Sequence, residues 1–264
     1  MRRRSSFLGL GLLLFATPLF AQTPPLEHFQ CYAVKQATPP MIVPLELRDQ
    51  FTVPGTAVDQ VEASRVVKFC NPAGKFHRNQ FFPVQDDRQH LTFFATYPQS
   101  EPVRVVVLSN QFDRTAAQPQ TWIIEDAVAL AVPTHKPPHN PPVGLDHYRC
   151  YRAHGTAAIT PEVVGLIDEF LPFSGRAVLH PSLFCNPVVK KRLDTGDVTP
   201  ILNPNVHMAC YATTRVAFAT SRDIETQFGR QTLLVGPPDT LCVPTRKLNF
   251  VQIPDSPIGG INQQ

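Results

Sequence analysis

The sequence predicts an all-β fold of two tandem six-stranded antiparallel β domains, barrel-like or sandwich-like, with pseudo-twofold repeats and disulfide braces. Three observations predict it. A phrase that opens on histidine and closes on lysine occurs four times in the 264 residues. Proline, with 28 residues, is about twice as frequent as usual, and it suits strand edges and turns rather than helix interiors. Six cysteines follow an export signal. The alternative architecture is one four-bladed, propeller-like ring.

The first 21 residues have the features of a Sec-type signal peptide. Three arginines at 2–4 precede an apolar run at 7–20, and Ala21 offers a small residue for cleavage. The run is too short for a convincing membrane span, so we expect no integral span after removal of the signal; an uncleaved anchor is the alternative. These features predict a secreted or periplasmic protein that begins with a short spacer at 22–27.

Charge argues against nucleic acid as a partner. The chain carries 24 Lys and Arg against 21 Asp and Glu, and the signal peptide holds three of the arginines and no acidic residue. Removing three from 24 leaves 21 basic against 21 acidic residues, so the mature chain is close to neutral. A neutral chain lacks the basic surface that nucleic acid or an anionic membrane requires.

The repeated phrase has three landmarks. Each unit opens on a histidine that is followed by Cys-Tyr, or by Phe-Phe in the second unit. Each unit closes on Cys-x-Pro, or on Ala-x-Pro in the second unit, followed by a lysine. Between them, the middle segment ends in Asp-Gln-Phe or a variant, at Phe51, Phe112, Phe170 and Phe228. Because three landmarks keep their order four times, we interpret them as a structural repeat. The framework residues are His28, His90, His147, His207, Lys75, Lys136, Lys190 and Lys247.

Each unit is expected to contribute three strands, about twelve in total. The first two units show them as alternating or β-branched runs, at 29–34, 41–51, 61–70, 90–96, 103–108 and 122–132. Residues 161–170 could form a helix, but their equivalents in the other units are strands, so we predict a strand. A hairpin is expected around Gly229. The proline-rich segment 137–146 is predicted to link domain 28–136 to domain 147–247, and 248–264 to form a C-terminal tail.

The repeat also predicts the disulfides. Six cysteines in an exported chain imply three bridges. The second unit has lost both cysteines, to Phe93 and Ala131, and this leaves no free thiol only if bridges lie within units. We therefore predict Cys31–Cys70, Cys150–Cys185 and Cys210–Cys242, each worth roughly 3–4 kcal/mol in the chain-entropy model.

No residue stands out as catalytic, metal-binding or cofactor-binding. Four equivalent histidines and four equivalent lysines are expected in a framework rather than in one active site. His135 and His139 have the i, i+4 spacing of a helical metal site, but two prolines lie between them. Asp86 and Asp87 before His90 are expected in a solvated turn. No nucleophile-elbow, zinc-protease or phosphate-loop motif is present, and we expect no metal and no cofactor.

The phrase resembles a repeat of exported bacterial proteins that have no characterised role. In that repeat the pattern reads roughly His-Phe-x-Cys-Tyr, then Asp-Gln-Phe, then Leu-Cys-Asn-Pro or Leu-Cys-Val-Pro followed by lysine. Residues 28–32, 49–51, 70–75 and 241–247 match it, and the second unit departs from it by lacking cysteines. The resemblance implies an exported location and a repeat architecture, and no activity.

Three functions remain open. The first is a non-catalytic binding or structural module, secreted or at the cell envelope, with a protein or glycan partner. The second is a hydrolase of extracellular polymers with a site where the two halves meet. The third is a subunit of an envelope assembly that is recruited through a strand edge or the tail. The hydrolase would require convergence of the residues that break the repeat: Asp86, Asp87, Arg88, Trp122, Glu125 and Asp126.

Overall fold

The computed structural model describes residues 26–52, 59–97, 101–113, 115, 118–156 and 161–253. The predicted signal peptide and the end of the predicted tail lie outside these residues. Sixteen strands and no helix occur in this part of the chain, so the all-β prediction is confirmed. It contains no helix that is long and apolar enough to cross a membrane.

Twelve of the strands are the three per unit that the repeat predicts. The opening strands are β1 (Phe29–Gln36), β6 (His90–Thr96), β9 (Tyr148–Gly155) and β14 (His207–Thr213). The middle strands are β2 (Val43–Arg48), β7 (Arg104–Ser109), β10 (Glu162–Ile167) and β15 (Thr220–Thr226). The closing strands are β3 (Asp59–Pro72), β8 (Gln120–Thr134), β11 (Ser174–Pro187) and β16 (Gly229–Gln252). Segment 161–170 contains a strand as expected, because the repeat outweighs local helix propensity.

Four further short strands follow the closing strands of the first and third units. They are β4 (Gly74–His77), β5 (Gln80–Phe82), β12 (Val189–Arg192) and β13 (Val198–Thr199). The β4–β5 turn uses Arg78 and Asn79 with positive φ, and the turn into β16 places Gly229 at φ 108°. The expected hairpin around Gly229 is therefore present, with β15 pairing along the first part of β16.

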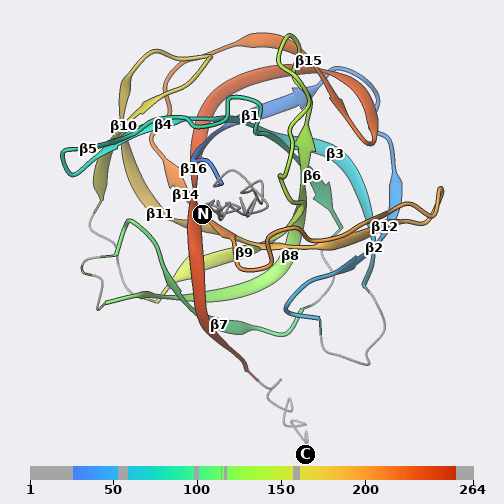
Figure 1. Ribbon diagram of the computed structural model, residues 1–264, viewed down its shortest axis with the longest axis horizontal. Coiled ribbons are helices and arrows are strands. Elements are labelled where there is room, and N and C mark those ends of the chain that lie inside the picture. The colour runs from blue at the N-terminus through green and yellow to red at the C-terminus, as the bar shows by residue number, and fades with distance from the viewer. Residues whose placement is uncertain are drawn as a thin grey trace, which may run out of the picture.

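The opening and closing strands form one closed antiparallel circuit, seen as a ring in Figure 1. Its order is β1, β3, β6, β8, β9, β11, β14, β16 and back to β1. Within this circuit, the predicted halves, 28–136 and 147–247, are hydrogen-bonded to each other at two places, β8–β9 and β16–β1. The four units share one sheet, whereas two tandem domains or separate propeller blades would each keep their own. Segment 137–146 connects neighbouring strands of that sheet.

The middle strands tie together units that lie opposite each other in the ring. Each pairs with its own closing strand and with the segment after the closing strand two units away. The pairs are β2–β12, β10–β4 and β7–β16, and a single bridge joins His135 to Glu225 at β15. The first part of the predicted tail is therefore not a tail, because β16 continues to Gln252 beside β7.

The cysteines lie together in one buried cluster. The structure pairs Cys31 with Cys70, Cys150 with Cys185 and Cys210 with Cys242, as the loss of both cysteines from the second unit predicts. In each bridge the two residues are direct partners across neighbouring strands. Phe93 and Ala131 are partners at the same register and belong to the same cluster. The aromatic ring thus occupies the place of the fourth disulfide.

Two more hydrophobic clusters complete the core, and each draws on all four units. One contains Phe51, Trp122, Phe184 and Leu241. The other contains Leu45, Phe94, Val188 and Leu233. Because each unit contributes to both, neither half of the chain has a core of its own.

Candidate functional site

The framework histidine and lysine of each unit lie beside the middle motif of the next unit and form a node with it. In the first and third units, both contact the glutamine of that motif. In the first such node, Nε2 of His28 lies 3.1 Å from Oε1 of Gln111, and the Lys75 ammonium group donates to the same oxygen. The Lys75 ammonium also lies 4.6 Å from the ring centre of Phe82 and 5.2 Å from that of Phe112. The framework lysine thus donates a hydrogen bond to the glutamine of the middle motif and lies against the ring of its phenylalanine.

Two further nodes repeat this arrangement around the ring. Gln227 contacts both His147 and Lys190, and Gln50 lies 3.1 Å from His207. In the last node, Lys247 reaches Asn186 instead, and its ammonium lies 4.8 Å from the Phe51 ring. Since the fourth unit meets the first, the nodes close the circuit with side chains as well as with strands.

Burial governs the charge state of these nodes. Desolvation lowers the pKa of Lys75 to about 7 and that of Lys190 to about 8. It lowers the pKa of His28 to about 4 and that of His147 to about 3. Neutral imidazoles and neutral amides thus surround the lysines, and the repetition of this environment around the ring fits a structural role.

A second set of contacts crosses the ring. The tyrosine of each opening motif reaches the first residue of the middle motif two units away. Tyr32 donates to Asp168 at 2.7 Å, Tyr151 to Asp49 at 2.7 Å, and the hydroxyl of Tyr211 accepts from Asn110 at 2.9 Å. In the fourth pair, Phe94 replaces the tyrosine and Thr226 replaces the acid. The donor and its acceptor are lost together, so no phenol or carboxylate is left buried without its partner.

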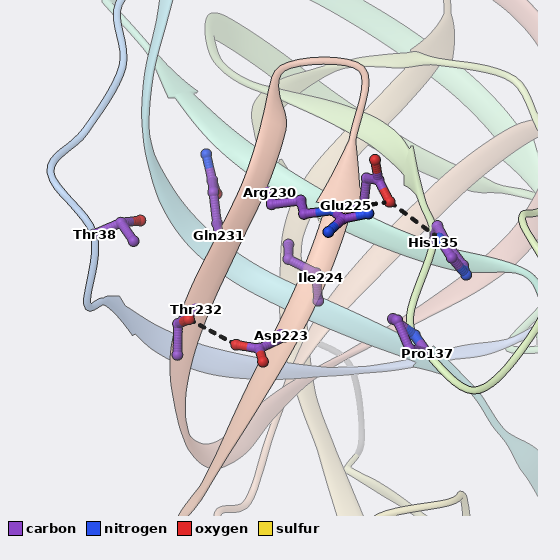
Figure 2. Close-up of a pocket in the computed structure, with 9 residues that line it drawn as sticks. All are labelled: Thr38, His135, Pro137, Asp223, Ile224, Glu225, Arg230, Gln231 and Thr232. Atoms are coloured by element: carbon purple, nitrogen blue, oxygen red, sulfur yellow. Dashed lines mark hydrogen bonds and ion pairs between the residues drawn. The ribbon is translucent and has the colours of Figure 1, made fainter.

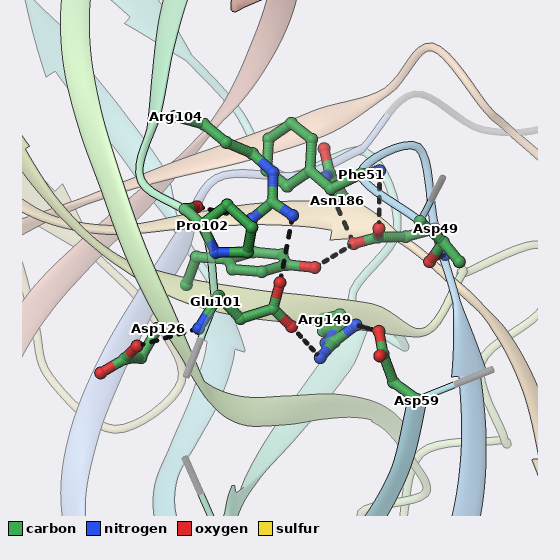
Figure 3. Close-up of polar contacts among 11 residues, drawn as sticks. Asp49, Phe51, Asp59, Glu101, Pro102, Arg104, Asp126, Arg149 and Asn186 are labelled. Atoms are coloured by element: carbon green, nitrogen blue, oxygen red, sulfur yellow. Dashed lines mark hydrogen bonds and ion pairs between the residues drawn. The ribbon is translucent and has the colours of Figure 1, made fainter. Parts of the chain in front are cut away.

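A buried network of charges surrounds one of these pairs (Figure 3). Arg149 pairs with Asp59 and, at 2.6 Å, with Glu101, which Arg104 also contacts at 3.1 Å. Arg149 and Arg104 are 2% and 3% exposed. Buried guanidinium groups need such partners because an unpaired buried charge is strongly destabilising. The two arginines and the two carboxylates of the network therefore pair with each other, which fits a structural role.

The second node departs from the other three. Glu169 replaces glutamine, and its Oε2 receives the Lys136 ammonium group. His139, from the segment after the second unit, lies 2.9 Å from the same oxygen. His90, the framework histidine of this node, is 1% exposed, and its ring centre lies 5.3 Å from that of His139. The carboxylate and the extra histidine make this the candidate site.

A depression of about 540 Å³ lies beside the node (Figure 2). The β15–β16 hairpin forms one wall, and His135 and Pro137 lie on the opposite side. Glu225 lies 3.5 Å from both His135 and Arg230. Nε2 of His135 is also 2.8 Å from the backbone oxygen of His139, which connects the wall of the depression to the node.

The residues considered for a hydrolase do not converge. Asp86 and Arg88 pair with each other at 2.7 Å in the turn before β6, and Trp122 is buried in the core. Glu125 lies 3.9 Å from His154 on the neighbouring strand. Asp126 lies 3.4 Å from the backbone nitrogen of Glu101. The Asp87 carboxylate reaches the candidate site, 3.5 Å from His139.

Sequence reasoning identified the framework histidines and lysines as repeated positions but missed what they touch. The middle-motif glutamine was the available signal, because it repeats in three units and changes to Glu169 in the third. His139 was considered only as a partner of His135. The fold instead brings it to His90 and Glu169.

The chain belongs to a family described as a repeat of unknown function (DUF7450), whose model matches residues 94–244, more than half of the 264 residues. The match agrees with the predicted repeat family. Neither the curated proteins nor the solved structures include a match to the chain.

Proposed function

We propose that the protein is an exported, non-catalytic binding module that holds a protein partner on one apolar outer surface. Export is supported by the signal-like residues at 1–21 and by three buried disulfides, which persist in oxidising compartments. A non-catalytic role is supported by the framework, since its titratable groups are buried and, apart from His90, make hydrogen bonds or ion pairs within the repeat. The partner surface is the outer face of strands β10, β4 and β5.

Five large apolar side chains are exposed on this face. They are Val163, Ile167, Phe76, Phe81 and Phe173, with exposed fractions of 71%, 39%, 40%, 51% and 59%. Phe76 is the direct partner of Phe81 on one side and of Gly165 on the other. A methyl group added at Gly165 would lie 2.2 Å from the Phe173 ring, so that ring lies directly on the sheet. The side chains therefore form one continuous surface, of the kind that marks interaction sites.

The repeat provides an internal comparison for this surface. Strands β2, β12 and β13 form the equivalent outer face, built from the same first and third units with their roles exchanged. Aligning the framework lysines Lys75 and Lys190 places Lys191 where Phe76 stands, Arg48 where Ile167 stands and Glu46 where Gly165 stands. On that face Lys191 and Glu46 form an ion pair at 3.3 Å. On the same framework, one outer face thus carries Glu46, Arg48 and Lys191 beside the exposed Val198, whereas the other carries five exposed apolar side chains. This difference is the observation that carries the proposal.

The edge of the sheet indicates the kind of partner. Among the described strands, β5 ends its sheet and pairs with β4 alone. An added strand could therefore pair with its free backbone groups while apolar side chains cover Phe81 and Phe76. We infer an extended protein segment with alternating apolar residues. A glycan would need polar groups that this face does not present.

Site-specific crosslinking in the producing cell tests this function. A photo-reactive residue at position 81 should capture one protein species, identified by mass spectrometry, and the same residue at position 198 on the charged face should not. Replacing Phe76 and Ile167 with the residues of the charged face (F76K with I167R) should abolish the capture without changing thermal unfolding.

The matched control replaces residues of the charged face, R48A with K191A, and should leave the capture intact. The proposal fails if position 81 captures nothing, if position 198 captures the same species, or if F76K with I167R retains the capture. Capture of a second copy of this chain alone would also overturn it, in favour of self-association.

A further inference from the structure

The Glu169 node, defined as His90, Lys136, His139 and Glu169, brings together three side chains that can ligate a metal. One nitrogen of each histidine and one carboxylate oxygen of Glu169 all lie within 4.8 Å of one another. They come from three separate segments: the start of β6, the segment after β8 and the turn after β10. No spacing rule along the chain would predict such a set, because only the closed circuit makes these segments neighbours.

His90 lacks the partner that its equivalents have. In the other nodes, His28, His147 and His207 each contact a glutamine side chain. At His90, neither ring nitrogen has a hydrogen-bond partner in the described part of the chain, and the residue is 1% exposed. A buried polar group without a partner costs about 1–3 kcal/mol. The imidazole is held by stacking on Phe69, with ring centres 5.8 Å apart.

His139 is oriented as a ligand. Its Nε2 faces Glu169 at 2.9 Å, while its Nδ1 lies 3.5 Å from the Asp87 carboxylate. A carboxylate beside the far nitrogen is the usual arrangement behind a metal-bound histidine, because it fixes the ring and raises its basicity. The bond between His135 and the backbone oxygen of His139 holds the segment in place.

We propose that His90, His139 and Glu169 bind one divalent transition-metal ion, with Zn²⁺ as the best match. Two imidazoles and one carboxylate are a zinc ligand set that leaves a fourth position open. Glu169 is 41% exposed and His139 is 20% exposed, so water or a ligand can reach that position. The proposal goes beyond the partner surface and rests on different residues.

Lys136 limits the affinity. Its ammonium group donates to the Glu169 carboxylate, so an incoming cation has to displace another cation. We therefore expect binding at roughly micromolar Zn²⁺, or about −8 kcal/mol, rather than the much tighter binding of closed structural zinc sites.

The test is isothermal titration of Zn²⁺ into the tag-free mature protein after chelation, with Co²⁺ absorption as a second readout of ligand geometry. We expect one ion per chain. Glu169→Gln restores the residue of the other nodes, so it should fold normally in chelator and lose at least about tenfold in affinity. His139→Ala should lose binding to a similar extent.

Gln227→Glu is the matched control, because it places a carboxylate beside His147 and Lys190, where no second histidine contacts the node in the described part of the chain. It should bind no additional ion. The proposal is overturned if the wild-type protein binds no Zn²⁺ at 100 micromolar, about a hundredfold above the expected dissociation constant. It is equally overturned if E169Q and H139A bind as tightly as wild type, or if Q227E gains a second site.

Discussion

The cross-ring pair of Tyr151 and Asp49 allows a quantitative test of the repeat, because the chain itself contains the alternative pair. The Tyr151 hydroxyl is fully buried and donates to Oδ2 of Asp49 at 2.7 Å. Burial raises the pKa of Tyr151, so the phenol stays neutral and keeps its proton for this bond. Phe94 and Thr226 fill the equivalent positions without such a bond.

Replacing one partner leaves the other buried without its hydrogen bond. Tyr151→Phe removes a donor from a carboxylate that keeps the Phe51 nitrogen at 2.8 Å and Asn186 at 3.3 Å, and should cost about 2 kcal/mol. Asp49→Thr leaves the buried Tyr151 hydroxyl without its acceptor and should lower the free energy of unfolding by about 3 kcal/mol. The threonine can still accept from the Phe51 nitrogen, as Thr226 does from that of Phe228 at 3.1 Å.

The double variant recreates the Phe–Thr pair and should cost about 3 kcal/mol rather than the sum of about 5, a coupling of about 2 kcal/mol. Urea unfolding with the disulfides intact measures the three free energies of unfolding. Each kcal/mol should correspond to a fall of about 2–4 °C in Tm for a chain of this size. Additivity within about 0.5 kcal/mol would refute the reasoning, because it would mean that the pair makes no specific contact.

Two further predictions follow from the register and the buried framework. Phe93→Cys with Ala131→Cys should form a fourth disulfide, because these residues are direct partners where the other units have cystines. Mass spectrometry would detect the bridge as the loss of two hydrogens. Two free thiols under oxidising conditions would contradict the fourfold register. The unfolding free energy should fall as pH is lowered from about 7 to 5. Burial lowers the pKa of His28 and His207 to about 4, below the ~6.5 of an unfolded histidine, so the unfolded chain binds more protons in this range. His28→Gln and His207→Gln should flatten the slope, which urea titrations at several pH values would show.

The strand plan and the disulfides could be predicted because both follow from local or internally repeated information. Alternation and β-branched runs indicate strands, and the repeat corrected the helix-like segment 161–170. The simultaneous loss of cysteines at Phe93 and Ala131 restricted the bridges to single units. These inferences needed no knowledge of how the units pack.

The partners of the framework could not be predicted, because they depend on which units become neighbours. His28 and Lys75 meet Gln111 of the next unit, whereas Tyr32 meets Asp168 two units away. The same four units in two separate domains would have produced different contacts from the same motifs. The contacts of Glu169, which replaces the glutamine of the other units, therefore could not be predicted from the sequence, because they depend on the closed circuit.

The sequence by itself determined that the protein is all-β, that four units share one framework and that three bridges brace them, since each follows from patterns within a unit. Only the tertiary structure decided that the units form one sheet, because strand pairing between distant segments depends on burial shared by the whole chain. It also decided where to look for function. The closed circuit brings His90, His139 and Glu169 together, and it exposes an apolar outer face on β10, β4 and β5 where the equivalent face on β2 and β12 is charged.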